Sequence, residues 1–89
     1  MLQGTGHMQH DIKVHPQFWE PLIKGDMKFQ LRRNDRVYKV GDTLMLNEFN
    51  PEFGYTGKQR LSIVSYVLMP EDCPGLVAGF CILGLGPVL

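Results

Sequence analysis

Strand-like segments fill most of this 89-residue chain, and they limit the folds it can adopt. Alternating or β-branched residues between glycine and proline turns predict strands at residues 11–15, 28–32, 43–49, 61–69 and 77–85. Only residues 16–25 show helical spacing, with Pro16 in the first turn and Gly25 as the stop. About five strands with one early helix are too many strands for an open α/β sheet. The pattern therefore predicts a mixed α+β, mainly β fold, a small and partly closed mixed β-barrel.

The chain has the length and composition of one small domain. Hydrophobic residues make up 44% and charged residues 20%, a composition typical of globular chains. We interpret residues 1–9 as a disordered remnant of cloning and residues 10–89 as a single domain. The first residues show no signal peptide, and no apolar stretch is long enough to span a bilayer. We therefore expect a cytoplasmic protein without a membrane partner.

Basic residues are concentrated in one window, although the whole chain is neutral. Residues 24–39 contain two acidic and six basic side chains, a net charge of +4, and the basic ones are Lys24, Lys28, Arg32, Arg33, Arg36 and Lys39. A local positive patch attracts phosphates, and the nearby rings of Tyr38, Phe53 and Tyr55 are of the kind that stacks on unpaired bases. The alternative is a solvated strand edge whose charges prevent aggregation.

Residues 28–32 alternate in polarity and are expected to present two different faces. The pattern places Phe29 and Leu31 in the core and Lys28, Gln30 and Arg32 on the opposite face. Such a polar face is suited to lining a cleft, where the Gln30 amide would read a base edge through its donor and acceptor. The alternative is an ordinary exposed strand face.

Motifs for catalysis or metal binding are not found. Cys73 and Cys81 are too few for a zinc site, and we expect Cys81 to lie in the core. His10 and His15 fall at opposite ends of a strand, a poor arrangement for a ligand pair. No phosphate-binding glycine loop or serine elbow is present. We therefore expect no catalytic residue, no metal and no cofactor.

A series of motifs along the chain resembles a known family. In order they are residues 10–13, Phe18-Trp19, residues 25–36, Val40-Gly41-Asp42 and residues 54–57. Together they resemble a small bacterial and phage family of unknown function within the ASCH superfamily. The resemblance covers about residues 10–85 and implies a PUA-like fold, a pseudo-barrel with an early helix.

The resemblance also implies a binding cleft. ASCH domains carry a Gly-x-Lys-x-x-Glu-x-Arg signature along a cleft and are thought to bind RNA or, in some members, DNA. Gly25 and Arg32 match this signature, whereas Met27 and Gln30 replace its lysine and glutamate. One branch is similar to an amidohydrolase that deacetylates N4-acetylcytidine with lysine, threonine and glutamate, and here Met27 and Gln30 stand at its lysine and threonine positions. The departures favour binding without catalysis and leave the charge of Arg32 free for a phosphate.

The leading hypothesis is therefore an RNA-binding domain for single strands or a modified nucleotide. Arg32 and Lys28 would contact phosphate and Gln30 the base. Long-range attraction would come from Arg33, Arg36 and Lys39, and stacking from Tyr55 or Phe53.

Two alternatives belong to other classes. The first is an amidohydrolase for a modified nucleoside, which would require Lys28 and Glu48 to reach the cleft. The second is an interaction module that dimerises through the apolar C-terminal residues Leu85, Val88 and Leu89. The oligomeric state stays open.

Overall fold

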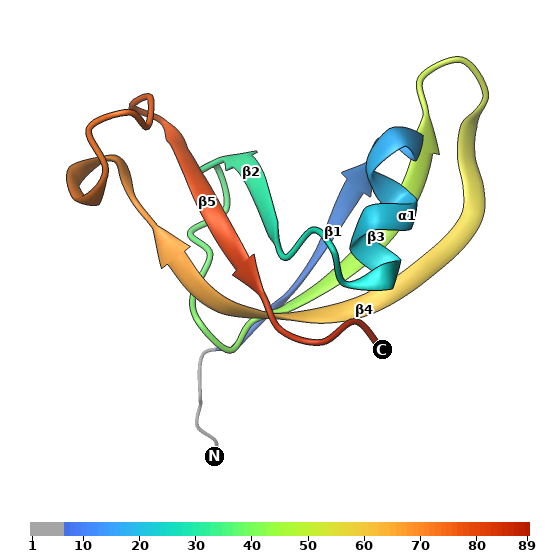
Figure 1. The fold of residues 1–89 in the computed structure, drawn as a ribbon, viewed down its shortest axis with the longest axis horizontal. Coiled ribbons are helices and arrows are strands. Elements are labelled where there is room, and N and C mark those ends of the chain that lie inside the picture. The colour runs from blue at the N-terminus through green and yellow to red at the C-terminus, as the bar shows by residue number, and fades with distance from the viewer. Residues whose placement is uncertain (1–6) are drawn as a thin grey trace.

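The computed structural model describes residues 7–89 and contains five strands and one α-helix (Figure 1). In chain order the elements are β1 (Gln9–Val14), α1 (Pro16–Lys24), β2 (Phe29–Arg33), β3 (Thr43–Asn50), β4 (Gly54–Leu68), the 3-10 helix η1 (Pro70–Asp72) and β5 (Phe80–Leu85). The expected mixed α+β, mainly β fold with an early helix is confirmed. The strands form one mixed sheet in the order β1-β3-β4-β5-β2, in which only β1 and β3 are parallel.

The long strand β4 joins two arms of this sheet. Its first part pairs with β3 and its last part with β5, and the register of the second pairing shifts between Val64 and Tyr66. Figure 1 shows β4 curving beneath both arms, so that the sheet bends. The bend brings its two edge strands, β1 and β2, to face each other. Arg32 of β2 donates to the Lys13 carbonyl of β1. Arg36, in the loop that follows β2, donates to the Asp11 carbonyl of β1.

Helix α1 begins and ends as its sequence indicates. Pro16 occupies the first turn, and the His15 ring accepts a hydrogen bond from the Gln17 N–H at 3.2 Å. Gly25 ends the helix at φ 84°, a left-handed conformation that glycine adopts without steric cost. Trp19 and Leu22 point into the core, whereas Phe18 remains exposed beside β1.

The core lies inside the bend and is built mainly from alternate residues of the strands. Its members are Ile12, Val14, Trp19, Leu22, Tyr38, Leu44, Leu46, Val64, Cys81, Leu83 and Leu85. The expected core position of Cys81 is confirmed, and burial raises the pKa of its thiol. Within residues 7–89 no helix has the length and apolar character needed to cross a membrane.

The expected orientation of β2 is wrong. Gln30 is only 5% exposed, whereas Phe29 and Leu31 are 51% and 57% exposed. The pairing with β5 gives the reason, because Gln30 lies opposite Leu83, whose side chain is buried. Partners in a sheet share a face, so register with a buried strand, rather than side-chain polarity, decides which face of β2 points inward.

Two boundaries also differ from expectation. Residues 1–6 of the expected cloning remnant lie outside the described residues, but β1 already begins at Gln9, and Met8 is hydrogen-bonded to Asp42 and Thr43. The strand predicted at residues 61–69 begins earlier, because β4 starts at Gly54. The turn that remains is short and exposes the Phe53 ring.

Candidate nucleic-acid interface

A groove of about 590 Å³ runs between the facing edges of β1 and β2, next to α1. Its apolar lining comes from Phe18, Met27, Phe29 and Leu31, and its polar lining from Lys13, His15, Gln30 and Arg32. None of these lining side chains is acidic. The size is within the range of small-molecule sites, and apolar walls with a few polar groups are typical of them.

The cationic end of the groove is held by contacts between the two edge strands. Arg32 Nη1 donates to the Lys13 carbonyl at 3.0 Å. A guanidinium has five N–H donors, so most of those of Arg32 remain available to an anion. The Lys13 ammonium lies 4.4 Å from the centroid of Phe49 and 5.9 Å from that of Tyr55. Lys13 therefore connects the groove to the rings of Phe49 on β3 and Tyr55 on β4. These two rings meet edge to face, with their centroids 4.9 Å apart.

Gln30 is the buried polar side chain of the groove. Its Nε2 donates to the carbonyl of Phe29 at 3.3 Å. Among the described residues, nothing donates a hydrogen bond to its Oε1. A buried acceptor without a donor costs free energy unless water or a ligand supplies one, so this oxygen marks a place for a ligand donor.

The remaining predicted site residues lie outside the groove lining. Lys28 lines a neighbouring cavity of about 300 Å³ beside the end of α1. The Arg33 guanidinium lies 5.1 Å from the centroid of the Phe80 ring. Arg36 bonds the Asp11 carbonyl and lies 3.8 Å from the Asp35 carboxylate. The Lys39 side chain is exposed.

Sequence reasoning placed Gln30 and Arg32 at the cleft but missed the residues that complete it. Lys13 lies on β1, His15 directly after it, and Phe18 in the first turn of α1. Phe29 and Leu31 lie on the exposed face of β2, the reverse of the predicted orientation. Among the groove residues that were missed, only Met27 had a signal in the sequence, because it stands at a position of the ASCH signature. The others come together because two strands far apart in sequence face each other.

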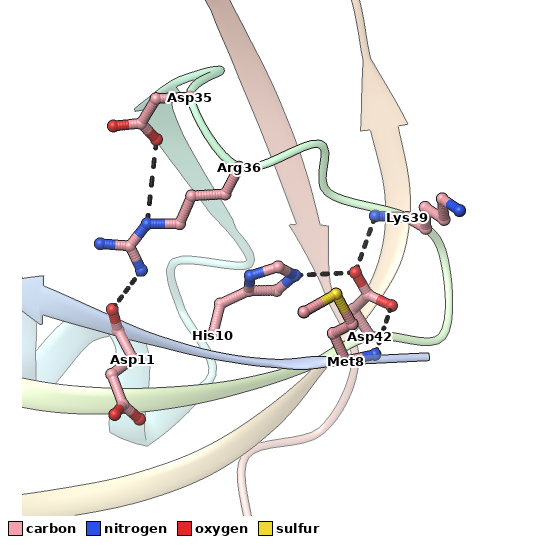
Figure 2. A network of polar contacts seen from close by, with 7 residues as sticks. All are labelled: Met8, His10, Asp11, Asp35, Arg36, Lys39 and Asp42. Atoms are coloured by element: carbon pink, nitrogen blue, oxygen red, sulfur yellow. Dashed lines mark hydrogen bonds and ion pairs between the residues drawn. The ribbon is translucent and has the colours of Figure 1, made fainter. Parts of the chain in front are cut away.

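A second polar cluster, centred on Asp42, was also missed (Figure 2). The Asp42 carboxylate is 1% exposed and accepts hydrogen bonds from His10 Nε2 at 2.8 Å and from the N–H groups of Met8 and Lys39 at 3.1 and 3.0 Å. Burial alone would raise the pKa of this carboxyl, but the three hydrogen bonds outweigh it and lower the pKa. The cluster joins β1 to the start of β3 and is a structural element.

The residues required by a hydrolase do not line the groove. The Glu48 carboxylate accepts a hydrogen bond from Thr56 Oγ1 at 2.8 Å, and Lys58 Nζ lies at 3.9 Å. Glu48 and Lys28 are both absent from the groove lining. Across residues 7–89 no three His, Cys, Asp or Glu side chains are grouped to hold a metal ion.

The C-terminal residues expected to form a dimer seam have different environments. Leu85 belongs to the core, and Val88 packs against it. Only Leu89 is largely exposed, at 72%. Its N–H donates to the carbonyl of Leu61 at 2.7 Å, which ties this end of the chain to β4.

The chain is similar to proteins of unknown function. An uncharacterized 12.9 kDa protein in the GpA 3′ region of Escherichia phage P2 is 35% identical over 40 residues. The aligned part covers 45% of this chain and 37% of the phage protein, so the similarity spans little more than a third of that relative. The sequence profile of the domain of unknown function DUF3850 matches residues 9–85. Since this match includes every strand and the helix, the chain belongs to the DUF3850 family.

Proposed function

We propose that this chain binds single-stranded RNA, or a nucleotide-like ligand, in the groove between β1 and β2. The observation that carries the proposal is the lining of the groove, which combines apolar walls and two cationic side chains with no carboxylate. This combination suits phosphates and bases, because cations neutralise the backbone and apolar faces stack on unpaired bases. The resemblance of residues 25–32 to the ASCH signature, and of the whole to a PUA-like domain, supports the same assignment.

Each residue near the groove has a distinct role in this proposal. Arg32 contacts a phosphate, together with Lys13, and Gln30 bonds the base. Further bases of the RNA stack on Tyr55 and Phe53, which extends the path of the strand beyond Lys13. The exposed side chains of Lys28, Arg33, Arg36 and Lys39 attract the strand from a distance, an effect that salt weakens.

A binding titration with a short single-stranded RNA at low and at physiological salt tests the proposal. Saturable, salt-sensitive binding is expected, and Arg32→Ala should weaken it and reduce its salt dependence. Arg36→Ala is the matched control, because Arg36 makes an equivalent bridge to β1 but lies outside the groove lining. Absence of binding at low salt, or an equal loss in both variants, would contradict the proposal.

The hydrolase alternative has its own test. Turnover of N4-acetylcytidine that disappears in Lys28→Ala would favour it. The positions of Lys28 and Glu48 outside the groove lining lead us to expect no turnover.

A further inference from the structure

We propose that the main chain of β2 reads the base, with the Leu31 N–H as the donor that bonds an unpaired nucleobase. The inference rests on the proposed function and adds to it the part of the ligand that is recognised. It is carried by the hydrogen-bond pattern of an edge strand.

The pairing of β2 with β5 determines where each main-chain group of β2 points. The Leu85 N–H donates to the Lys28 carbonyl at 2.9 Å, and the Asn34 N–H donates to the Gly79 carbonyl at 2.8 Å. In an antiparallel pair, hydrogen-bonded residues alternate with residues whose N–H and C=O point away. Between these two bonds, Gln30 and Arg32 therefore bond to β5. Phe29 and Leu31 direct their main-chain groups to the free edge, where the groove lies.

Three carbonyls along the two facing edges already have partners. The carbonyls of Asp11 and Lys13 on β1 accept bonds from arginine side chains. The carbonyl of Phe29 on β2 accepts a bond from Gln30 Nε2. On β2, no described residue bonds to the Phe29 N–H, the Leu31 N–H, the Leu31 carbonyl or Gln30 Oε1. Of these groups, the Leu31 N–H and Gln30 Oε1 are a donor and an acceptor on consecutive residues. Both belong to residues that line the groove.

A donor beside an acceptor matches the edge that a nucleobase uses in a base pair. Each base presents adjacent donors and acceptors there, and in a duplex that edge is already occupied by the opposite strand. The rings of Phe18 and Phe29, both in the groove lining, supply apolar surface for the face of the same base. The site therefore selects an unpaired base, with the anionic backbone toward Lys13 and Arg32.

Replacement of Leu31 by its α-hydroxy acid tests the inference directly. The resulting ester keeps the side chain and removes the N–H, which is not part of the ladder with β5. It also makes the Gln30 carbonyl, which does belong to that ladder, a weaker acceptor. The probe is whichever of the four homopolymeric RNA pentanucleotides binds the unmodified protein most tightly. The ester should raise its dissociation constant about three- to tenfold, the range for loss of one hydrogen bond, and leave the salt dependence unchanged.

Controls separate this inference from the proposed function. Leu31→Ala keeps the N–H and should bind more tightly than the ester protein. Methylation of the base-pairing nitrogen of the RNA, or a complementary strand, should weaken binding to the unmodified protein. Equal affinity of the ester and unmodified proteins, or equal affinity for duplex, would overturn the inference while RNA binding stands. No binding of any pentanucleotide to the unmodified protein would overturn the proposed function itself.

Discussion

Asp42 and Gln30, two buried polar residues of this protein, differ in how completely their hydrogen bonds are made. In the cluster centred on Asp42, three donors converge on one carboxylate, and each is within 3.1 Å. In the groove, Gln30 is almost as buried, but its Oε1 accepts no hydrogen bond from the described residues. The hydrogen bonds of Asp42 are complete within the protein, and those of Gln30 are complete only with water or a ligand.

This difference assigns separate roles to Asp42 and Gln30, although both are polar residues in the sequence. A satisfied buried carboxylate stabilises the fold, because removal of the carboxylate leaves three donors without a partner. An unsatisfied amide contributes little stability and provides specificity when a ligand bonds to it. Stability and binding should therefore respond to different substitutions, which is testable.

The largest expected effect is on stability, at Asp42. Asp42→Ala should lower the free energy of unfolding by about 3 kcal/mol, because it leaves buried donors unpaired. RNA affinity, measured where the variant is folded, should change less than twofold. Urea unfolding followed by the fluorescence of Trp19, the only tryptophan, measures the loss. The exposed Asp35→Ala is the control, and a loss below about 1 kcal/mol in Asp42→Ala would remove the distinction between Asp42 and Gln30.

Acid should weaken the same cluster. The pKa of Asp42 in the folded protein lies below its ordinary value of 3.8, so the unfolded chain takes up the proton first as the pH falls. The stabilisation by Asp42 is therefore complete above about pH 5 and declines from about pH 4 toward the lower pKa of the folded state. Urea midpoints between pH 2.5 and 6 should show this decline, and Asp42→Asn should reduce it. An identical pH dependence in both proteins would be inconsistent with this assignment.

Gln30 should show the opposite behaviour to Asp42. Gln30→Leu should change the free energy of unfolding by less than about 1 kcal/mol, because it removes an unsatisfied buried acceptor and one long hydrogen bond. It should weaken RNA binding about tenfold, equivalent to about 1.4 kcal/mol. The pair of measurements, urea unfolding and RNA titration, sharpens the comparison. If Gln30→Leu lost as much stability as Asp42→Ala and kept its RNA affinity, Gln30 would be a structural residue and the comparison with Asp42 would fail.

The smallest effect is expected at the arginine bridge outside the groove. Arg36→Ala removes an exposed hydrogen bond to the Asp11 carbonyl and should lower the unfolding free energy by about 0.5–1 kcal/mol. Affinity for RNA should fall slightly and only at low salt, because Arg36 acts through long-range attraction. A loss of affinity that persists at physiological salt would place Arg36 in direct contact with the ligand.

Local features of the sequence predicted the fold better than they predicted the site. Pro16 and Gly25 bound the helix because capping depends on neighbouring residues, and the alternation of Ile12 and Val14 identified β1. The inward face of β2 depends on its register with β5, a strand some fifty residues away. Asp42 was noted only within the Val40-Gly41-Asp42 motif, because its partner His10 lies 32 residues earlier in the chain. Long-range pairing therefore decided the surroundings of both polar residues, and no local pattern shows it.

The most direct test of the central claim is a 15N–1H correlation spectrum recorded during titration with a short single-stranded RNA. The account predicts that the amide signals of Phe29 and Leu31, on the free edge of β2, shift most. The signals of His10 and Asp42 should move little. Shifts centred on His10 and Asp42, or shifts spread over the basic residues with Leu31 unmoved, would contradict the account.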